Sequence, residues 1–169
     1  MLSILSPAKT LDYETAPTTK KSTQPLFIDQ AVSLVKSARK MGPEDIQDLM
    51  GVSEKIATLN HERFMNWEPY FSLKNAKQSV LAFKGDVYTG LQAETLSADE
   101  LAFAQKHLRI LSGLYGLLRP LDLMQPYRLE MGLPFANAGG KNLYEFWGDR
   151  ITETLGQHLK ASGSPVLVN

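Results

Sequence analysis

Short apolar runs alternate along the chain with longer segments of helical periodicity. Residues 2–5 (LSIL) are apolar and stop at Ser6 and Pro7, which predicts a buried strand. Further apolar runs at 80–83, 109–112 and 166–168 predict three more strands. Between 25 and 41 the apolar residues recur at helical spacing, and Gly42-Pro43 then ends the pattern. This alternation of strands and helices predicts an α/β domain.

Other helix boundaries are marked by capping and stop signals. Short helices are predicted over 44–50 and 54–65, separated by Gly51, Val52 and Ser53. Ser97 and Glu100 form a capping-box pattern at the start of a helix that runs to 107 or 108. The apolar spacing from 143 to 159 predicts one long late helix. Residues 15–25, rich in Thr, Lys, Ser and Pro, are expected to form a loop.

Composition restricts the chemistry that this chain can perform. Its 169 residues match one domain, and the lack of cysteine excludes disulfides, thiolate nucleophiles and cysteine-based metal centres. His61, His107 and His158 do not stand at metal-ligand spacing, so no metal site is expected. No run approaches the ~18 apolar residues of a membrane span, and the N-terminus lacks a signal-peptide pattern. We therefore expect a cytoplasmic protein without a membrane partner.

Equal numbers of basic and acidic residues, 18 of each, hide an uneven distribution. Residues 1–42 hold six Lys/Arg and three Asp/Glu, a net charge of +3. Residues 43–100 hold five and ten, a net charge of −5, and residues 101–169 hold seven and five, a net charge of +2. Two interpretations remain open: a basic surface assembled from the two ends of the chain, or ordinary scatter of charge.

The segment 49–57 (LMGVSEKIA) has the pattern of a helix-hairpin-helix. A tight hairpin between two short helices directs backbone N–H groups of the second helix outward, where they can bind a phosphate oxygen. Lys55 adds a positive charge, and such a module binds the nucleic-acid backbone without reading its sequence. The usual motif has Gly where this chain has Ser53, which lacks glycine's freedom at positive φ. The alternative is a purely structural pair of helices.

Polar side chains also cluster in three loops that interrupt apolar sequence. Residues 6–10 (SPAKT) and 84–90 (KGDVYTG) each follow a predicted strand, which is where ligands often bind in α/β sheets. In residues 111–130, Arg119 and Arg128 stand in apolar surroundings, either as internal ion pairs with Asp122 and Glu130 or as an anion site. Together the loops provide a candidate pocket: Ser6, Asp86, Tyr88, Ser112, Tyr115 and Tyr127.

Four segments resemble the bacterial YaaA family of peroxide stress resistance proteins: residues 6–11 (SPAKTL), 82–91 (AFKGDVYTGL), 109–132 and 143–147 (LYEFW). The resemblance covers the whole chain, in order. It implies a cytoplasmic protein that protects cells against hydrogen peroxide by limiting iron-driven damage. It also implies an α/β fold of unusual topology, a mixed sheet with surrounding helices, and a basic cleft. A helix-hairpin-helix at about 44–65 would bind double-stranded or distorted DNA. The resemblance brings no characterised enzymatic activity and no cofactor.

Carried onto this sequence, the resemblance places the DNA-binding hairpin on Gly51, Val52, Ser53 and Lys55, and the basic cleft on Lys9, Lys84, Arg119 and Arg128. The residues leave a second hypothesis open: an enzyme of unknown reaction that acts on a small anionic or nucleotide-like substrate at the three loops. Direct iron binding is a weaker third hypothesis, because no ligand spacing supports it. One groove shared by the cations and the hairpin would favour DNA binding, whereas a separate pocket would favour the enzyme.

The resemblance also bears on the extent of the domain. Chains of this family continue beyond the segment that matches residues 166–169, with further sheet and a segment rich in Lys and Arg. We therefore expect the single domain over 1–169 to be incomplete at its C-terminal end.

Overall fold

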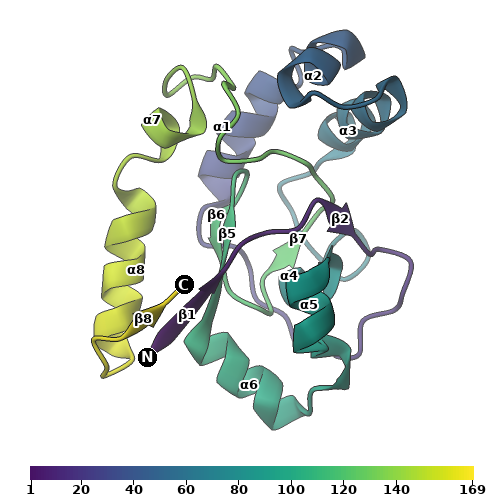
Figure 1. The fold of residues 1–169 in the computed structure, drawn as a ribbon. Coiled ribbons are helices and arrows are strands. Elements are labelled where there is room, and N and C mark those ends of the chain that lie inside the picture. Colours follow the sequence, from purple (N-terminus) through teal and green to yellow (C-terminus); the bar gives the residue numbers. More distant parts are fainter.

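A four-stranded mixed sheet lies at the centre of the computed structural model, which describes residues 1–169 (Figure 1). Its strand order is β6-β5-β1-β8. Strand β1 (Leu2–Leu5) runs parallel to both β5 (Leu108–Ser112) and β8 (Leu167–Val168), whereas β6 (Gly116–Leu118) is antiparallel to β5. Leu5 pairs with Ile110, so β1 and β5 end at the same edge of the sheet. The strands expected near 2–5, 109–112 and 166–168 are confirmed.

Two small antiparallel ladders flank this sheet. Strand β2 (Thr10–Leu11) pairs with β4 (Phe83–Lys84), and β3 (Lys77–Gln78) pairs with β7 (Leu123–Met124). The strand expected over 80–83 is wrong, because Ser79–Ala82 form the short helix α4. The amide of Ser79 donates to the carbonyl of Asp122 at 2.8 Å, which anchors the start of this helix. A buried apolar run this short has no periodicity that distinguishes a strand from one helical turn.

Helices surround the sheets, and most of their bounds follow the sequence pattern. They are α1 (Ile28–Ala38), α2 (Pro43–Met50), α3 (Glu54–Asn66), α5 (Asp86–Leu91), the 3-10 helix η1 (Ala93–Thr95), α6 (Ala98–His107), α7 (Leu143–Trp147) and α8 (Arg150–Ala161). The capping box of α6 is confirmed, since Ser97 Oγ accepts from the Glu100 amide at 3.3 Å and Glu100 Oε2 accepts from the Ser97 amide at 2.8 Å.

The long helix expected over 143–159 is wrong. Helix α7 ends at Trp147, and Gly148 follows with φ 48°, a backbone conformation that interrupts the helix. Helix α8 then starts at Arg150.

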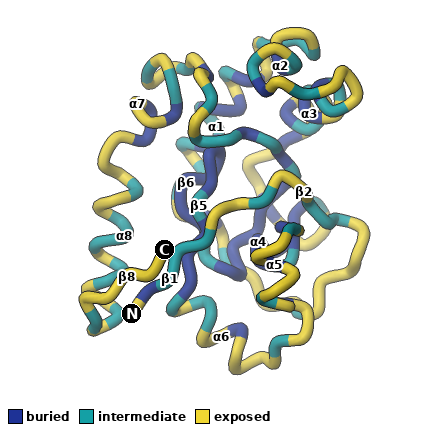
Figure 2. Tube along the Cα trace, viewed as in Figure 1, coloured by how far each residue is buried: buried dark blue, intermediate teal, exposed yellow.

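One contiguous hydrophobic core joins α1, α3, β5, β6 and α7. Figure 2 shows β5 and β6 as buried, while α8 and β8 are intermediate to exposed along their length. Trp147 fills part of this core, and its indole Nε1 donates to the carbonyl of Gly113 at 3.0 Å. No helix of the structure combines the length and the apolar character needed to cross a membrane.

Candidate anion-binding cleft

A cleft of about 360 Å³ opens where β1 and β5 end. Because the two strands are parallel neighbours, the loops that leave their carboxyl ends emerge together, the place where α/β sheets commonly bind ligands. Ser6 to Lys9 follow β1, and Ser112 and Gly113 come from the end of β5. Residues 127–132 form the remaining wall. Loops that are more than a hundred residues apart in the sequence thus share one cavity.

The lack of a side chain at Gly113 allows the wall of the cleft at Leu129 to lie close to the end of β5. A Cβ at this position would clash with the backbone carbonyl of Leu129. Only glycine allows this approach without a shift of the backbone. Tyr127 and Arg128, which directly precede Leu129, are thereby held against the end of β5.

Two cations meet one carboxylate in this cleft. Glu130 Oε1 lies 3.3 Å from Arg128 Nη2 and 3.5 Å from Lys9 Nζ. The Lys9 side chain is 65% exposed, whereas that of Arg128 is 17% exposed. Arg128 Nε is buried and has no hydrogen-bond partner. Arg128, which lines the cleft, therefore keeps one unused guanidinium donor beside a second positive charge.

A pair of hydroxyl groups lies deeper in the same cleft. Ser112 Oγ and the Tyr127 hydroxyl are 2.6 Å apart, and Ser112 Oγ also accepts from the Tyr115 amide at 2.9 Å. Burial raises the pKa of Tyr127 above its ordinary value, so its phenol stays protonated and acts as a hydrogen-bond donor or acceptor. The contacts of Ser112 supply no base that would activate it as a nucleophile. This arrangement is suited to binding.

Three of the expected site residues lie outside the cleft. Tyr115 is fully buried in the core, where its hydroxyl accepts from Trp67 Nε1 at 2.9 Å. Asp86 is exposed on α5 and lines neither the cleft nor the cavity beside it. Tyr88 is buried, and its hydroxyl donates to the Ser6 carbonyl at 2.8 Å, which supports the first loop of the cleft from behind.

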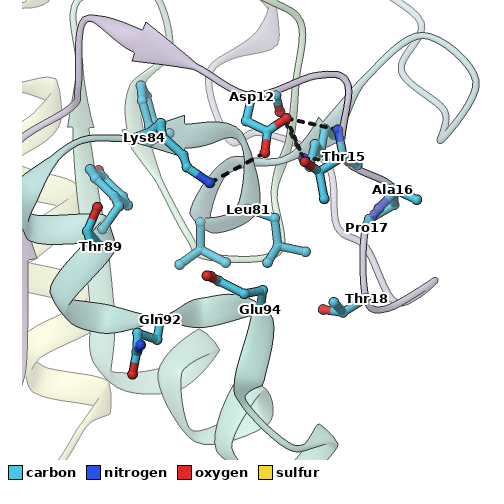
Figure 3. A pocket seen from close by; sticks show the side chains of 14 residues that line it. Asp12, Thr15, Ala16, Pro17, Thr18, Leu81, Lys84, Thr89, Gln92 and Glu94 are labelled. Carbon is cyan, nitrogen blue, oxygen red and sulfur yellow. Dashed lines mark hydrogen bonds and ion pairs between the residues drawn. The ribbon is translucent and has the colours of Figure 1, made fainter.

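Lys84 and Arg119 are also separate from Lys9 and Arg128. Lys84 lines a second cavity, shown in Figure 3, and its Nζ lies 3.7 Å from Asp12 Oδ2. Arg119 forms an internal ion pair with the fully buried Asp122, with Nη2 and Oδ1 2.8 Å apart, and does not line the cleft. Of the two alternatives for Arg119, an internal ion pair or an anion site, the structure thus shows the ion pair. The four cations do not form one basic cleft.

Helices α2 and α3 form the hairpin that the sequence indicates, and they pack side by side (Figure 1). The left-handed backbone conformation falls on Gly51, with φ 60°, whereas Ser53 has an ordinary φ of −68°. Ser53 therefore needs no glycine-like freedom. It serves as the N-cap of α3, where its Oγ accepts from the Ile56 amide at 3.4 Å. The amides of Glu54 and Lys55, in the first turn, have no partner within the helix.

The charge of the hairpin is unfavourable for phosphate binding. Five acidic residues and two basic residues lie between Pro43 and Asn66, a net charge of −3. Lys55 lies next to Glu54 and shares a shallow surface depression with Glu62. The two helices and the turn are thus observed, but a phosphate-binding helix-hairpin-helix is not confirmed, and the net charge is of the wrong sign for one.

Comparisons with known proteins agree with the cleft-lining motifs. The family model described as peroxide stress protein YaaA matches residues 1–169. The chain belongs to this family. It is 59% identical over 169 residues to a UPF0246 protein of Cellvibrio japonicus and 58% identical over 172 residues to one of Cupriavidus metallidurans. Both alignments cover 100% of this chain and 66% of the relative, so the chain spans just under two thirds of the length of these relatives.

The description of this family names peroxide stress. Some of the charged residues that line the second cavity could not be identified from the sequence. Asp12, Lys77 and Glu94 line the cavity around Lys84. Glu130, a candidate ion-pair partner from the sequence, bridges the two cations of the cleft. No group of three or more His, Asp or Glu side chains in the structure is arranged to hold a metal ion.

Proposed function

We propose that this protein binds a small molecule with a phosphate or carboxylate group in the cleft between Lys9 and Arg128, as part of a cytoplasmic defence against hydrogen peroxide. The observation that supports this most is the buried, unpartnered Nε of Arg128. A buried donor without a partner costs about 1–3 kcal/mol. An oxyanion that accepts from this group would remove the cost, and the guanidinium offers two parallel donors to such an anion.

Isothermal titration calorimetry with adenosine monophosphate and with inorganic phosphate tests this proposal. Arg128→Lys keeps the charge and removes the donor pair, so we expect binding about tenfold weaker than that of the wild type. Lys106→Gln, an exposed lysine on α6, is the matched control and should bind normally. Absence of binding to the wild type, or equal binding to Arg128→Lys, would contradict the proposal.

Binding of DNA by the hairpin is the second candidate function. It is favoured by the exposed turn at Gly51, the free amides at the start of α3 and the neighbouring Lys55. It is opposed by the net charge of −3 between Pro43 and Asn66. The partner would be double-stranded or distorted DNA, bound without sequence preference through its phosphates.

Fluorescence anisotropy with an intact and a gapped duplex separates the two candidates. Hairpin binding predicts loss of affinity in Lys55→Glu and a steep decrease with rising salt. If Lys9→Glu weakens duplex binding and Lys55→Glu does not, the cleft is the DNA site and the hairpin is structural. If neither duplex binds at low salt, this chain has no DNA-binding function.

The proposed physiological result is less iron-driven damage under peroxide. A strain that lacks the endogenous protein, complemented with the wild type or with Arg128→Lys, would report this as survival in hydrogen peroxide. We expect Arg128→Lys to fail, and an iron chelator to restore survival. If the chelator has no effect, iron is not the link.

A further inference from the structure

The second cavity is a separate site that the cleft does not explain. It encloses about 200 Å³ between the loop after β2, helix α4, strand β4, helix α5 and η1 (Figure 3). It shares no lining residue with the cleft that holds Lys9 and Arg128. Val80, Leu81 and Phe83 provide apolar lining, and polar side chains surround them. Sites for drug-sized ligands are typically ~300–1,000 Å³, so this cavity is suited to a smaller metabolite.

Asp12 and Lys77 form an ion pair on one side of this cavity, with Nζ 3.8 Å from Oδ1. Lys77 is 7% exposed at its side chain, and its Nζ donates to the carbonyls of Asp12 and Thr15, both at 2.8 Å. Hydrogen bonds from Thr15, with the charge of Lys77, lower the pKa of Asp12 to about 2. Two of the three Lys77 donors therefore hold the loop at Thr15 in place.

Lys84 and Glu94 are the two charged lining residues whose side chains make no hydrogen bond. Lys84 is 58% exposed, and its Nζ lies 3.7 Å from the Asp12 carboxylate, beyond hydrogen-bond distance. The Glu94 carboxylate makes no hydrogen bond or ion pair in the structure. The Thr95 hydroxyl donates to the Gln92 carbonyl, and Lys77 donates to the carbonyls of Asp12 and Thr15. Figure 3 shows the Lys84 nitrogen and the Glu94 carboxylate on opposite sides of Leu81. A cation and an anion thus face the cavity across an apolar surface.

Gln92 adds an independent sign of a functional site. It is the only non-glycine residue with a positive φ, at 48°, and it lines the same cavity. A left-handed conformation costs a non-glycine residue roughly 1–2 kcal/mol, and glycine is the usual residue at such a helix end. Strained residues of this kind concentrate at ligand sites.

We infer that this cavity binds a small zwitterion, an α-amino acid with an apolar side chain. Its carboxylate would pair with Lys84, its ammonium with Glu94, and its side chain would lie on Val80 and Leu81. The four charged lining residues, Asp12, Lys77, Lys84 and Glu94, sum to zero, which favours a ligand without net charge. This inference rests on residues of its own and is independent of the proposed function of the cleft.

Titration of the chain with L-valine and L-leucine, followed by ligand-observed NMR and calorimetry, tests the inference. We expect saturable binding of at least one of the two amino acids. Lys84→Gln and Glu94→Gln should each weaken it about tenfold, the effect of removing one charge-assisted hydrogen bond. Lys141→Gln, an exposed lysine elsewhere, is the matched control and should leave the affinity unchanged. Thermal melting confirms that the exposed substitutions preserve the fold.

Two further probes separate a zwitterion site from a simple charge site. Isovalerate lacks the ammonium of L-valine, and isobutylamine lacks its carboxylate, so each should bind at least tenfold more weakly than L-valine. Equal binding of isovalerate would overturn the inference in favour of an anion site. It would also be overturned if neither amino acid bound, or if neither Lys84→Gln nor Glu94→Gln weakened binding.

Discussion

The cleft and the α2–α3 hairpin differ in how they are built. The hairpin is local, since its two helices are joined by residues 51–53. The cleft gathers residues 6–9, 112–113 and 127–132 through the pairing of β1 with β5. The hairpin combines a suitable turn with a net charge of −3 between Pro43 and Asn66. The cleft places two cations around one carboxylate and leaves a guanidinium nitrogen unpartnered.

This difference shows that a local motif and a suitable electrostatic environment can occur in different parts of one molecule. The turn that resembles a phosphate-binding module carries few positive charges. The positive charges with unused hydrogen-bonding capacity lie at strand ends, where no single stretch of sequence has the form of a phosphate-binding motif. The following variants test that contrast.

Gly113→Ala should have the largest effect. The added methyl group clashes with the Leu129 carbonyl, so we expect a loss of about 3 kcal/mol of unfolding free energy, together with loss of phosphate binding. Urea denaturation measures the first and calorimetry the second. Gly132→Ala, in the same cleft wall with open space around it, is the control and should stay within 0.5 kcal/mol, about the limit for ordinary surface substitutions.

Charge reversal at Lys9 and at Lys55 compares the two regions directly. Lys9→Glu should weaken binding of adenosine monophosphate by about tenfold or more, because it replaces an attractive charge in the cleft with a repulsive one. Lys55→Glu should leave the same affinity unchanged. An equal loss in both variants would mean that the hairpin and the cleft form a single binding surface.

Gly51→Ala examines the hairpin alone. Alanine at φ 60° costs roughly 1–2 kcal/mol, and we expect this loss in urea denaturation with no change in anion affinity. Gly156→Ala, in the middle of α8 with open space around it, should instead stabilise the chain by about 0.5–1 kcal/mol. A change in anion affinity in Gly51→Ala would link the hairpin to the cleft.

Glu130→Gln should have a smaller effect, of opposite sign, on binding. Glu130 competes with a ligand for Arg128 and Lys9, and partly exposed ion pairs of this kind contribute about 0–1 kcal/mol. We therefore expect anion affinity to rise up to about fivefold. Competition would be disproved by an affinity that is unchanged or reduced in calorimetry.

Acid should loosen the region around Asp12 beside the second cavity. The pKa of Asp12 is lowered from 3.8 to about 2 in the folded chain, so the ionised form stabilises the fold fully above pH 3.8. This contribution is lost as the pH falls from 3.8 towards 2. Melting temperature measured across this window should fall less in Asp12→Asn than in the wild type. Parallel curves would show that Asp12 does not contribute.

The sequence pattern predicted the elements that depend on neighbouring residues. The α6 capping box, the two hairpin helices and the strand at 2–5 are confirmed, because each depends on local spacing or a local stop signal. The predictions at 80–83 and 143–159 were wrong. A four-residue apolar run suits a helical turn or a strand equally well, and a single glycine at 148 ended a helix that the apolar spacing continued.

For the candidate site, the sequence identified the loops without showing how they meet. Ser6, Lys9, Ser112, Tyr127 and Arg128 were named from their motifs, and the structure places them in one cleft. Arg119 had the same kind of surroundings in the sequence as Arg128, yet it pairs with buried Asp122. Only the three-dimensional position of each partner carboxylate distinguishes the two arginines.

By itself, the sequence determined the α/β class, the two helices α2 and α3, the absence of thiol chemistry and the family to which the motifs point. The tertiary structure alone decided which charges meet. Glu130 bridges Lys9 and Arg128, and Asp12 lies between Lys77 and Lys84, while Glu94 makes no ion pair. The physical reason is the separation along the sequence of the residues that interact. Helix caps and turns depend on residues three or four positions apart. Electrostatic partners depend on distances through space, which strand pairing sets between segments far apart in the chain.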